Sequence, residues 1–244
     1  MIKEDFLQLV KTRRSIRGFK PDPVPDEYIN YMIDVARWSP SGANGQPWEF
    51  IVIKDQDTKN KMAELYELYR GEHYAIEQTR VEELRHHRTK SAAKGLPAFK
   101  DAPVLITACG DRRTFQASTL AGRYIGQTGG NTDDTYSKSM ANAIYGLQLA
   151  AAALGLGAQW LSVNSIWEQL LKPLLGIPPM IHIHTIVPVG YPDYEPKPPY
   201  RRDIAEITHY EKYDMAKFRD GEQIIEFIKE LRNKTKAVYA QEKR

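Results

Sequence analysis

The sequence predicts a single α+β domain of mixed strands and long helices. Hydrophobic residues make up 42% of the 244 residues and charged residues 27%, which is the balance of a chain that folds around an apolar core. Short apolar segments typical of strands alternate with longer segments in which apolar residues recur every third or fourth position. No internal repeat and no linker-like segment divides the chain into two independent cores.

The N-terminal part is expected to contain two helices and a strand. Apolar residues at helical spacing predict a short amphipathic helix in the first dozen residues. A second helix is expected from Pro25 to about Arg37, because proline followed by acidic residues is typical of a helix start. Residues 39–47, rich in Ser, Gly and Pro, indicate a loop that leads into a strand at 48–53.

Two polar segments are expected to flank a second strand. Residues 58–94 are heavily charged and mostly helical in pattern, which suits an exposed helix pair or a lid over a pocket. Residues 102–109 have the apolar composition of a buried strand. Residues 111–137, rich in Gly, Thr and Asp, show no clear period and are expected to form a long loop with a helical piece.

An uncharged stretch of 29 residues runs from Ser139 to Trp167. It exceeds the roughly 20 residues that a bilayer span needs. However, polar residues such as Asn142 and Gln148 interrupt it, and its middle is four consecutive alanines. Small residues at this density favour a buried helix packed closely against protein, ending near Gly155.

The C-terminal part is expected to contain two helices around a strand. A short helix should start at Ile166 and be ended by Pro173, because proline lacks the amide proton that a helix interior needs. Residues 181–187 alternate as a strand does. Residues 1–213 are expected to form the main domain, and 214–244 a helical extension that packs on the same domain or on a partner subunit.

Charge and cysteine content exclude several classes of function. A formal net charge of +3 does not require nucleic acid or a membrane surface as a partner. One cysteine, Cys109, cannot form an intramolecular disulfide or a cysteine-cluster metal site, and its apolar surroundings indicate a structural thiol. The acidic N-terminus does not resemble a secretory signal, so a cytoplasmic location is expected.

Histidines do not indicate a metal centre. His182 and His184 share one predicted strand face, but no carboxylate is near them in the sequence, and a packed or hydrogen-bonded pair is the favoured interpretation. Gly155 and Gly157 lack the third glycine of a dinucleotide-binding turn and follow a helix rather than a strand. We therefore expect no metal and no Rossmann dehydrogenase.

An arginine cluster is the first candidate for a binding site. Arg13, Arg14 and Arg17 surround Ser15, so three permanent cations and a hydroxyl could hold a phosphate through charge-assisted hydrogen bonds. A second arginine pair stands at 201–202. The alternative is that such clusters only solvate a surface.

The loop before the first strand is the second candidate. Ser41, Asn44 and Gln46 carry uncharged donors and acceptors that could read the amide-like edge of a heterocycle. Pro40 and Trp48 add apolar surface beside them. The alternative is a polar turn between helix and strand.

Five stretches in register resemble the FMN-dependent nitroreductase family, which uses NADH or NADPH. They are RRSIRGF at 13–19, SPSGANGQPW at 39–48, LGLGAQW at 154–160, VGYP at 189–192 and RRDIAEI at 201–207. Their order and spacing agree with the family over about residues 5–212. The resemblance implies a mixed sheet flanked by helices, in a homodimer with FMN at the subunit interface.

The resemblance also implies the cofactor contacts. The phosphate and ribityl end of FMN would be held by Arg13, Arg14, Ser15 and Arg17, joined by Arg201 or Arg202. The flavin would be approached from the partner subunit by Pro40, Ser41 and Asn44, with Gln46 as a further contact. Backbone amides near Leu161, Ser162 and Val163 would lie by the flavin N5. Because the flavin N5 carries the hydride, no catalytic side chain is required.

The implied activity is a ping-pong reduction of a small-molecule acceptor. NADH or NADPH would reduce FMN and leave, and a nitroaromatic, a quinone or a related electron-poor molecule would then be reduced. A reductive dehalogenase or a flavin-modifying enzyme on the same scaffold is one alternative, and a flavin-binding module without turnover is another.

Overall fold

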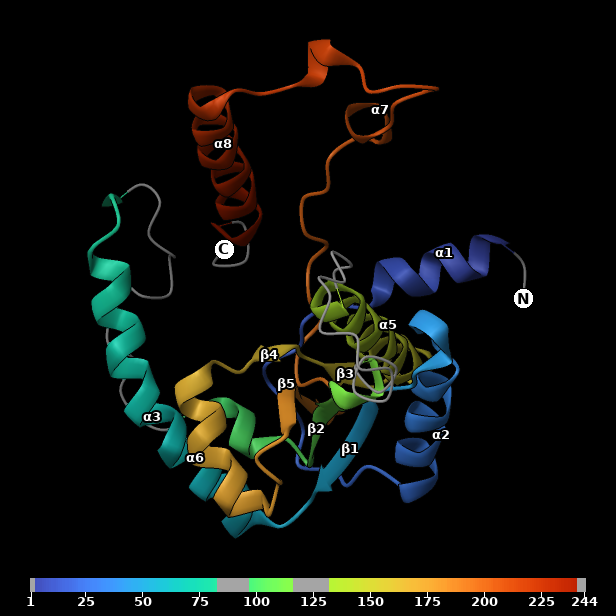
Figure 1. Cartoon of the computed structure of the whole chain (residues 1–244), viewed down its shortest axis with the longest axis vertical. Coiled ribbons are helices and arrows are strands. Elements are labelled where there is room, and N and C mark those ends of the chain that lie inside the picture. The colour runs from blue at the N-terminus through green and yellow to red at the C-terminus, as the bar shows by residue number, and fades with distance from the viewer. Residues whose placement is uncertain (1–2, 83–96, 116–131, 241–244) are drawn as a thin grey trace, which may run out of the picture. The chain divides into compact units, whose positions relative to one another are not determined.

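The structure, a computed structural model, describes residues 3–82, 97–115 and 132–240 (Figure 1). These residues form two compact units, one of residues 3–73 and 97–195 and the other of residues 74–82 and 196–240. The expected domain boundary between residues 213 and 214 falls within the second unit and stays a prediction.

The elements alternate between helices and strands along most of the chain. The α-helices are α1 (Lys3–Thr12), α2 (Asp26–Arg37), α3 (Gln56–Gln78), α5 (Thr132–Ala153), α6 (Ser165–Leu175), α7 (Ile204–Ile207) and α8 (Gly221–Ala240). The strands are β1 (Trp48–Ile53), β2 (Val104–Asp111), β3 (Gly157–Ala158), β4 (Leu161–Ser162) and β5 (Ile181–Gly190). The described residues also form short 3₁₀ turns at η1 (Gly42–Asn44), η4 (Ala98–Asp101) and η5 (Met215–Lys217).

The strands form one sheet in the order β1-β2-β5-β3, with β4 also paired to β5. All four strand pairs are antiparallel, and Ser15 adds a parallel bridge to Ala158 outside β3. The pairing of β2 with β5 passes from Ala108 opposite Thr185 to Cys109 opposite Ile183, so His184 is the extra residue of a β-bulge. Helices around a mixed sheet confirm the α+β prediction.

Helices cover both faces of the sheet (Figure 1). On one face, which we call the α2/α5 face, those two helices pack on apolar side chains of β2 and β5 such as Ile106 and Val187. On the other, the α3/α6 face, the core contains Leu105, Cys109 and the fully buried Trp167. Neighbouring strand residues point to opposite faces, which explains why β2 is buried along nearly its whole length.

Most local predictions are confirmed. The helix at 26–37 and the strand at 48–53 have the expected bounds, and α5 contains most of the buried residues of the uncharged stretch. Gly155, with φ of 74°, follows the end of α5 as expected. Of the helices in the described residues, none is long and apolar enough to cross a membrane.

Two boundaries are corrected by the structure. Helix α6 does not end at Pro173 but contains it and runs to Leu175, where Gly176 with φ of 65° forms the left-handed cap. The fixed φ of proline suits a helix, so only one backbone hydrogen bond is lost. Helix α5 begins at Thr132 and not near Ser139, and its first six residues are the helical piece expected within 111–137. Residues 83–96 and 116–131 of the two polar segments lie outside the described residues.

Candidate functional site

The arginine cluster is fixed to the edge of the sheet by backbone pairing. Ser15 bridges Ala158 of β3, and the Ile16 N–H donates to the Ala158 carbonyl at 3.0 Å. The Ile16 side chain is buried directly against Gly157, where a Cβ atom would come within 2.6 Å of it. Glycine at position 157 therefore allows the arginine segment to lie close to β3.

The arginine side chains include a buried donor that suits an anion. Within the described part of the chain, the Arg13 Nε is buried and has no hydrogen-bond partner. The Arg17 Nη1 donates to the Ser15 carbonyl at 3.2 Å, which orients a second guanidinium over the same segment. An unmet buried N–H costs about 1–3 kcal/mol, so a phosphate oxygen at this position would remove a penalty as well as add a charge-assisted bond.

Two residues that the sequence analysis missed hold this segment from the other side. The backbone N–H of Arg17 donates to the Tyr194 hydroxyl at 3.2 Å, and the Asp193 N–H donates to the Gly18 carbonyl at 3.3 Å. Gly18 leaves room for the Asp193 carboxylate, which a Cβ atom would approach to 2.3 Å. The signal was available, because both residues directly follow the VGYP stretch.

The backbone at Leu161, Ser162 and Val163 lies at the same edge of the sheet. Leu161 and Ser162 form β4 and pair with Ile186 and Thr185 of β5. The Thr185 hydroxyl also donates to the Leu161 carbonyl at 2.9 Å. Both β4 and β3 pair with the side of β5 that faces away from β2. The structure thus brings the arginine segment and the β4 backbone to one edge, as the implied FMN contacts require.

The loop before β1 has an unusual backbone. Ala43, Asn44 and Gln46 all have positive φ, at 49°, 54° and 41°. Only asparagine among these three tolerates the left-handed region readily. Ser41 stabilises the turn, because its hydroxyl accepts the Gln46 N–H at 3.1 Å and its carbonyl accepts the Asn44 N–H at 3.1 Å. Pro40 lies directly before this turn in the chain, and its carbonyl accepts a hydrogen bond from α5.

The loop is hydrogen-bonded to α5. The Ser139 hydroxyl accepts the Gly42 N–H at 3.2 Å, and the Asn142 amide donates to the Pro40 carbonyl at 3.2 Å. The arginine segment instead meets β3, which follows the C-terminal end of the same helix. From Ser139 to the last residue of α5 is about 21 Å of helix. Within one chain, the loop is thus held along the middle of α5, whereas the arginine segment meets the strand beyond the C-terminal end of that helix.

The second arginine pair lies in the second compact unit. The Arg202 side chain is engaged there: it donates to the Glu206 carbonyl at 3.0 Å, and its guanidinium lies 5.1 Å from the centre of the Phe227 ring. Arg201 is exposed, and its Nη1 donates to the carbonyl of the preceding Tyr200 at 3.0 Å. The two neighbours therefore differ in how much of their hydrogen-bonding capacity is already used.

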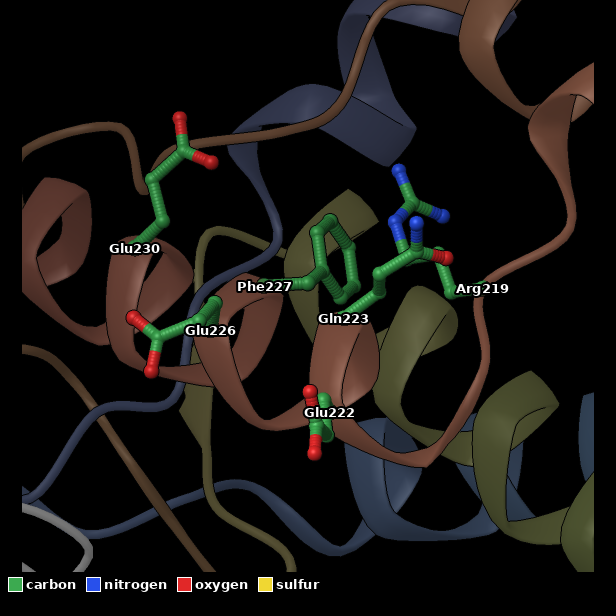
Figure 2. A pocket seen from close by; sticks show the side chains of 6 residues that line it. All are labelled: Arg219, Glu222, Gln223, Glu226, Phe227 and Glu230. Atoms are coloured by element: carbon green, nitrogen blue, oxygen red, sulfur yellow. The ribbon is translucent and has the colours of Figure 1, made fainter.

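A groove of about 590 Å³ lies along α8 in the same unit (Figure 2). Its lining includes three glutamates on one side of the helix, Glu222, Glu226 and Glu230. The Arg219 guanidinium lies 3.9 Å from the centre of the Phe227 ring and covers one face of it. Carboxylates in this number repel a phosphate, so this groove does not suit the phosphate end of a nucleotide cofactor.

His182 and His184 contact different helices and do not form a pair. The His184 Nε2 lies 2.8 Å from the Tyr136 hydroxyl of α5, and burial, followed by the Arg112 and His182 charges, lowers the pKa of His184 to about 4. The His182 Nδ1 lies 3.3 Å from Glu168 of α6. No carboxylate is near these histidines in the sequence, but the fold brings Glu168 of α6 to His182 of β5.

The described residues contain no cluster suited to a metal ion, and their cysteine is not a reactive thiol. Over residues 3–82, 97–115 and 132–240, no group of three or more His, Cys, Asp or Glu side chains could hold a metal ion. Cys109 is buried in β2, and burial raises the pKa of its thiol to about 12. The thiol is therefore protonated at neutral pH, as expected of a structural cysteine.

Comparison with known proteins identifies the fold and the family. The family model described as "Nitroreductase family" matches residues 10–191, which include the arginine segment, the loop and β4. The chain belongs to the nitroreductase family. A curated relative, iodotyrosine deiodinase from Thermotoga neapolitana, is 29% identical over 196 residues, which cover 80% of this chain and 92% of the relative.

Solved structures of the family include both nitroreductases and deiodinases. An FMN-dependent nitroreductase from Clostridium difficile R20291 has a TM-score of 0.60 and 22% identity, covering 85% of this chain and 99% of that chain. An oxidised iodotyrosine deiodinase bound to FMN and 3-iodo-L-tyrosine has a TM-score of 0.66 and 24% identity, covering 85% and 100%. The nitroreductase fold is thus shared with enzymes that act on different acceptors.

Proposed function

We propose that this nitroreductase-family chain is an FMN-dependent oxidoreductase that uses NADH or NADPH to reduce nitroaromatic, quinone or related electron-poor acceptors. The observation that carries the proposal is the joint position of the arginine segment and the β4 backbone at one sheet edge, with the Arg13 Nε buried and lacking a partner among the described residues. When bound, FMN would supply the redox chemistry, as the carrier of reducing equivalents between the reduced nicotinamide and the acceptor.

The residues of the chain bind and orient the cofactor. Arg13, Arg14 and Arg17 neutralise the phosphate, and the Ser15 hydroxyl adds a donor. Pairing with β3 fixes the arginine backbone, so little conformational entropy is lost when the phosphate binds. Pairing with β5 fixes the backbone at Leu161 and Ser162, so N–H groups near Ser162 and Val163 that reach the flavin would need no reorganisation at the moment of reaction.

The decisive experiment is anaerobic reduction followed by an acceptor screen. Purified protein is expected to be yellow, and NADH or NADPH should bleach it in the absence of oxygen. Reoxidation by a nitroaromatic, a quinone and 3-iodo-L-tyrosine is then compared. Protein that is colourless and gains no thermal stability from added FMN overturns the flavin proposal, and bound flavin that neither nucleotide reduces supports a binding module instead.

Reductive dehalogenation is the second candidate function. It is favoured by the deiodinase relatives, of which the Thermotoga neapolitana protein is an example. Release of iodide from 3-iodo-L-tyrosine at a rate well above reduction of the nitroaromatic would select this function over the first.

For the second phosphate-contacting arginine, we propose Arg201 rather than Arg202. Arg202 is already bound to Glu206 and lies against Phe227, whereas the exposed Arg201 uses one donor on its own neighbour's carbonyl. We expect Arg201→Ala to raise the dissociation constant for FMN about 10- to 100-fold, the range of a lost charge-assisted bond. Arg202→Ala is the matched control and should change FMN affinity less; the opposite ranking would reverse the assignment.

We also propose that the active form is a homodimer in which the loop at 40–46 serves the flavin of the partner subunit. The separation of this loop from the arginine segment along α5 supports the proposal. So does the exposure of large apolar side chains in the second unit, among them Ile204 at 79% and Met215 at 68%. Dilution should therefore release FMN as dimers dissociate, and a stable flavin-loaded monomer would refute this arrangement.

A further inference from the structure

The loop at 39–46 has a backbone that its own sequence does not favour. Alanine and glutamine do not favour a positive φ, yet Ala43 and Gln46 adopt it within four residues of each other, and the one local side-chain bond that the structure gives them runs from the Gln46 amide to the Asn44 carbonyl at 3.4 Å. Residues in sparsely populated backbone regions persist only where their surroundings over-determine them. The packing of the loop must therefore supply the constraint.

One face of α5 supplies it. Thr135, Ser139, Asn142 and Gly146 follow one another at spacings of four, three and four, which places them on one side of the helix. They meet the loop in reverse order along the chain. Gly146 lies against Ser39, where a Cβ atom would come within 3.1 Å of the Ser39 hydroxyl, and Asn142 donates to the Pro40 carbonyl.

The buried Ser139 hydroxyl is oriented by a second hydrogen bond. It donates its only proton to the Thr135 carbonyl at 2.7 Å, so its lone pairs are left to accept the Gly42 N–H at 3.2 Å. The acceptor that fixes the start of the η1 turn is thus locked in direction by the helix.

Gly42 is required by α5 and not by its own backbone. Its φ lies outside the left-handed region, so alanine could adopt the same conformation. A Cβ atom at this position, however, would come within 2.4 Å of the Thr135 Cγ2. Such a distance is a steric clash, which only a change of the Thr135 rotamer or a shift of the loop could relieve.

We propose that this α5 face positions the loop for the flavin, with Ser139 and Asn142 as positioning residues and the contact of Gly42 with Thr135 as the steric stop. The inference rests on the proposed function, since the loop residues Ser41, Asn44 and Gln46 are the predicted flavin contacts. It adds that their geometry is set by residues of a helix that do not themselves touch the cofactor.

The test measures FMN binding and the spectrum of bound flavin in matched variants of the full chain. Ser139→Ala is expected to raise the dissociation constant for FMN about tenfold and to change the visible circular dichroism of the bound flavin. Ser137→Ala is the control, because it removes a hydroxyl from an exposed position of the same helix. Thermal unfolding of each apoprotein separates loss of positioning from loss of folding.

A steric rescue makes the test independent of the hydrogen bond. Gly42→Ala should weaken FMN binding by more than Ser139→Ala does, and Thr135→Ser, which removes the Cγ2 atom, should restore it in the double variant to within about threefold of Thr135→Ser alone. Absence of rescue overturns the steric assignment.

The outcomes separate this inference from the proposed function. If the wild-type chain binds no FMN, the proposed function fails and this inference with it. If the wild-type chain binds FMN and Ser139→Ala behaves as Ser137→Ala does, this inference alone is overturned.

Discussion

The two faces of the sheet are packed by different means. On the α3/α6 face, aromatic rings fill the core: Trp167 lies 4.9 Å from Tyr66 and 5.8 Å from Phe99 between ring centres. On the α2/α5 face, small residues of α5 such as Ala143 and Ala151 allow close approach, and the same helix carries the polar side chains that hold the loop. The first face stabilises the fold, whereas the second both stabilises it and positions the candidate site.

The largest expected effect is on the α3/α6 face. Trp167→Ala removes a fully buried side chain, and we expect it to lower the free energy of unfolding by about 3–5 kcal/mol. Urea denaturation of the apoprotein measures this value. The control is Trp38→Ala, at a position 77% exposed, which should change the free energy far less. Comparable losses in the two variants would contradict a stabilising role of this face.

The next effect concerns His184, a half-buried histidine that meets Tyr136 on the α2/α5 face. The pKa of His184 is lowered from its ordinary 6.5 to about 4, so the unfolded chain binds a proton there more readily than the folded chain does. Stability is therefore fully present above about pH 6.5 and is lost as the pH falls toward 4, by up to about 3 kcal/mol. Tyr136 accepts or donates the hydrogen bond to the neutral ring.

Urea denaturation between pH 7 and pH 4.5 tests this dependence. The slope of unfolding free energy against pH should be smaller in His184→Gln than in the wild-type chain, because glutamine does not titrate. Equal slopes would show that other groups produce the acid sensitivity.

The smallest expected effect sharpens the comparison, because it changes binding and leaves folding nearly intact. Arg13→Ala removes a guanidinium that lies outside both core clusters, and we expect FMN affinity to fall about 10- to 100-fold. The unfolding free energy of the apoprotein should not fall, because the variant removes an unmet buried N–H and not a packed core side chain. Fluorescence titration with FMN measures the first and urea denaturation the second.

Lys11→Ala is the matched control for this cluster. It removes a nearby exposed cation from α1, so a purely electrostatic attraction would be weakened by a similar amount in both variants. Equal losses of FMN affinity would therefore show that Arg13 acts only through its charge.

The sequence predicted the elements whose signals are local. The bounds of α2 and β1 follow from a proline start, acidic first-turn residues and a run of apolar and aromatic residues. Sequence patterns did not predict features that depend on residues far apart in the chain. Helix α6 continues through Pro173, and Glu168 of α6 contacts His182 of β5. The bulge at His184 likewise has no signal in the sequence, because it depends on the pairing of β5 with β2.

The candidate site, like the fold, was predicted from the sequence only in part. The residue types were readable, since arginines around a serine suit a phosphate wherever they stand. Ser139 was not found, because a hydroxyl that accepts one backbone N–H leaves no pattern along the chain.

By itself, the sequence determined the fold class, most helices and strands, and the chemical groups available to a cofactor, because these depend on composition and on contacts between near neighbours. Only the tertiary structure decided which edge of the sheet carries the arginine segment, how Arg201 and Arg202 differ, and why the loop adopts positive φ at Ala43 and Gln46. Those properties arise from hydrogen bonds and steric contacts between residues far apart in the chain, which become definite only when the sheet and α5 are packed.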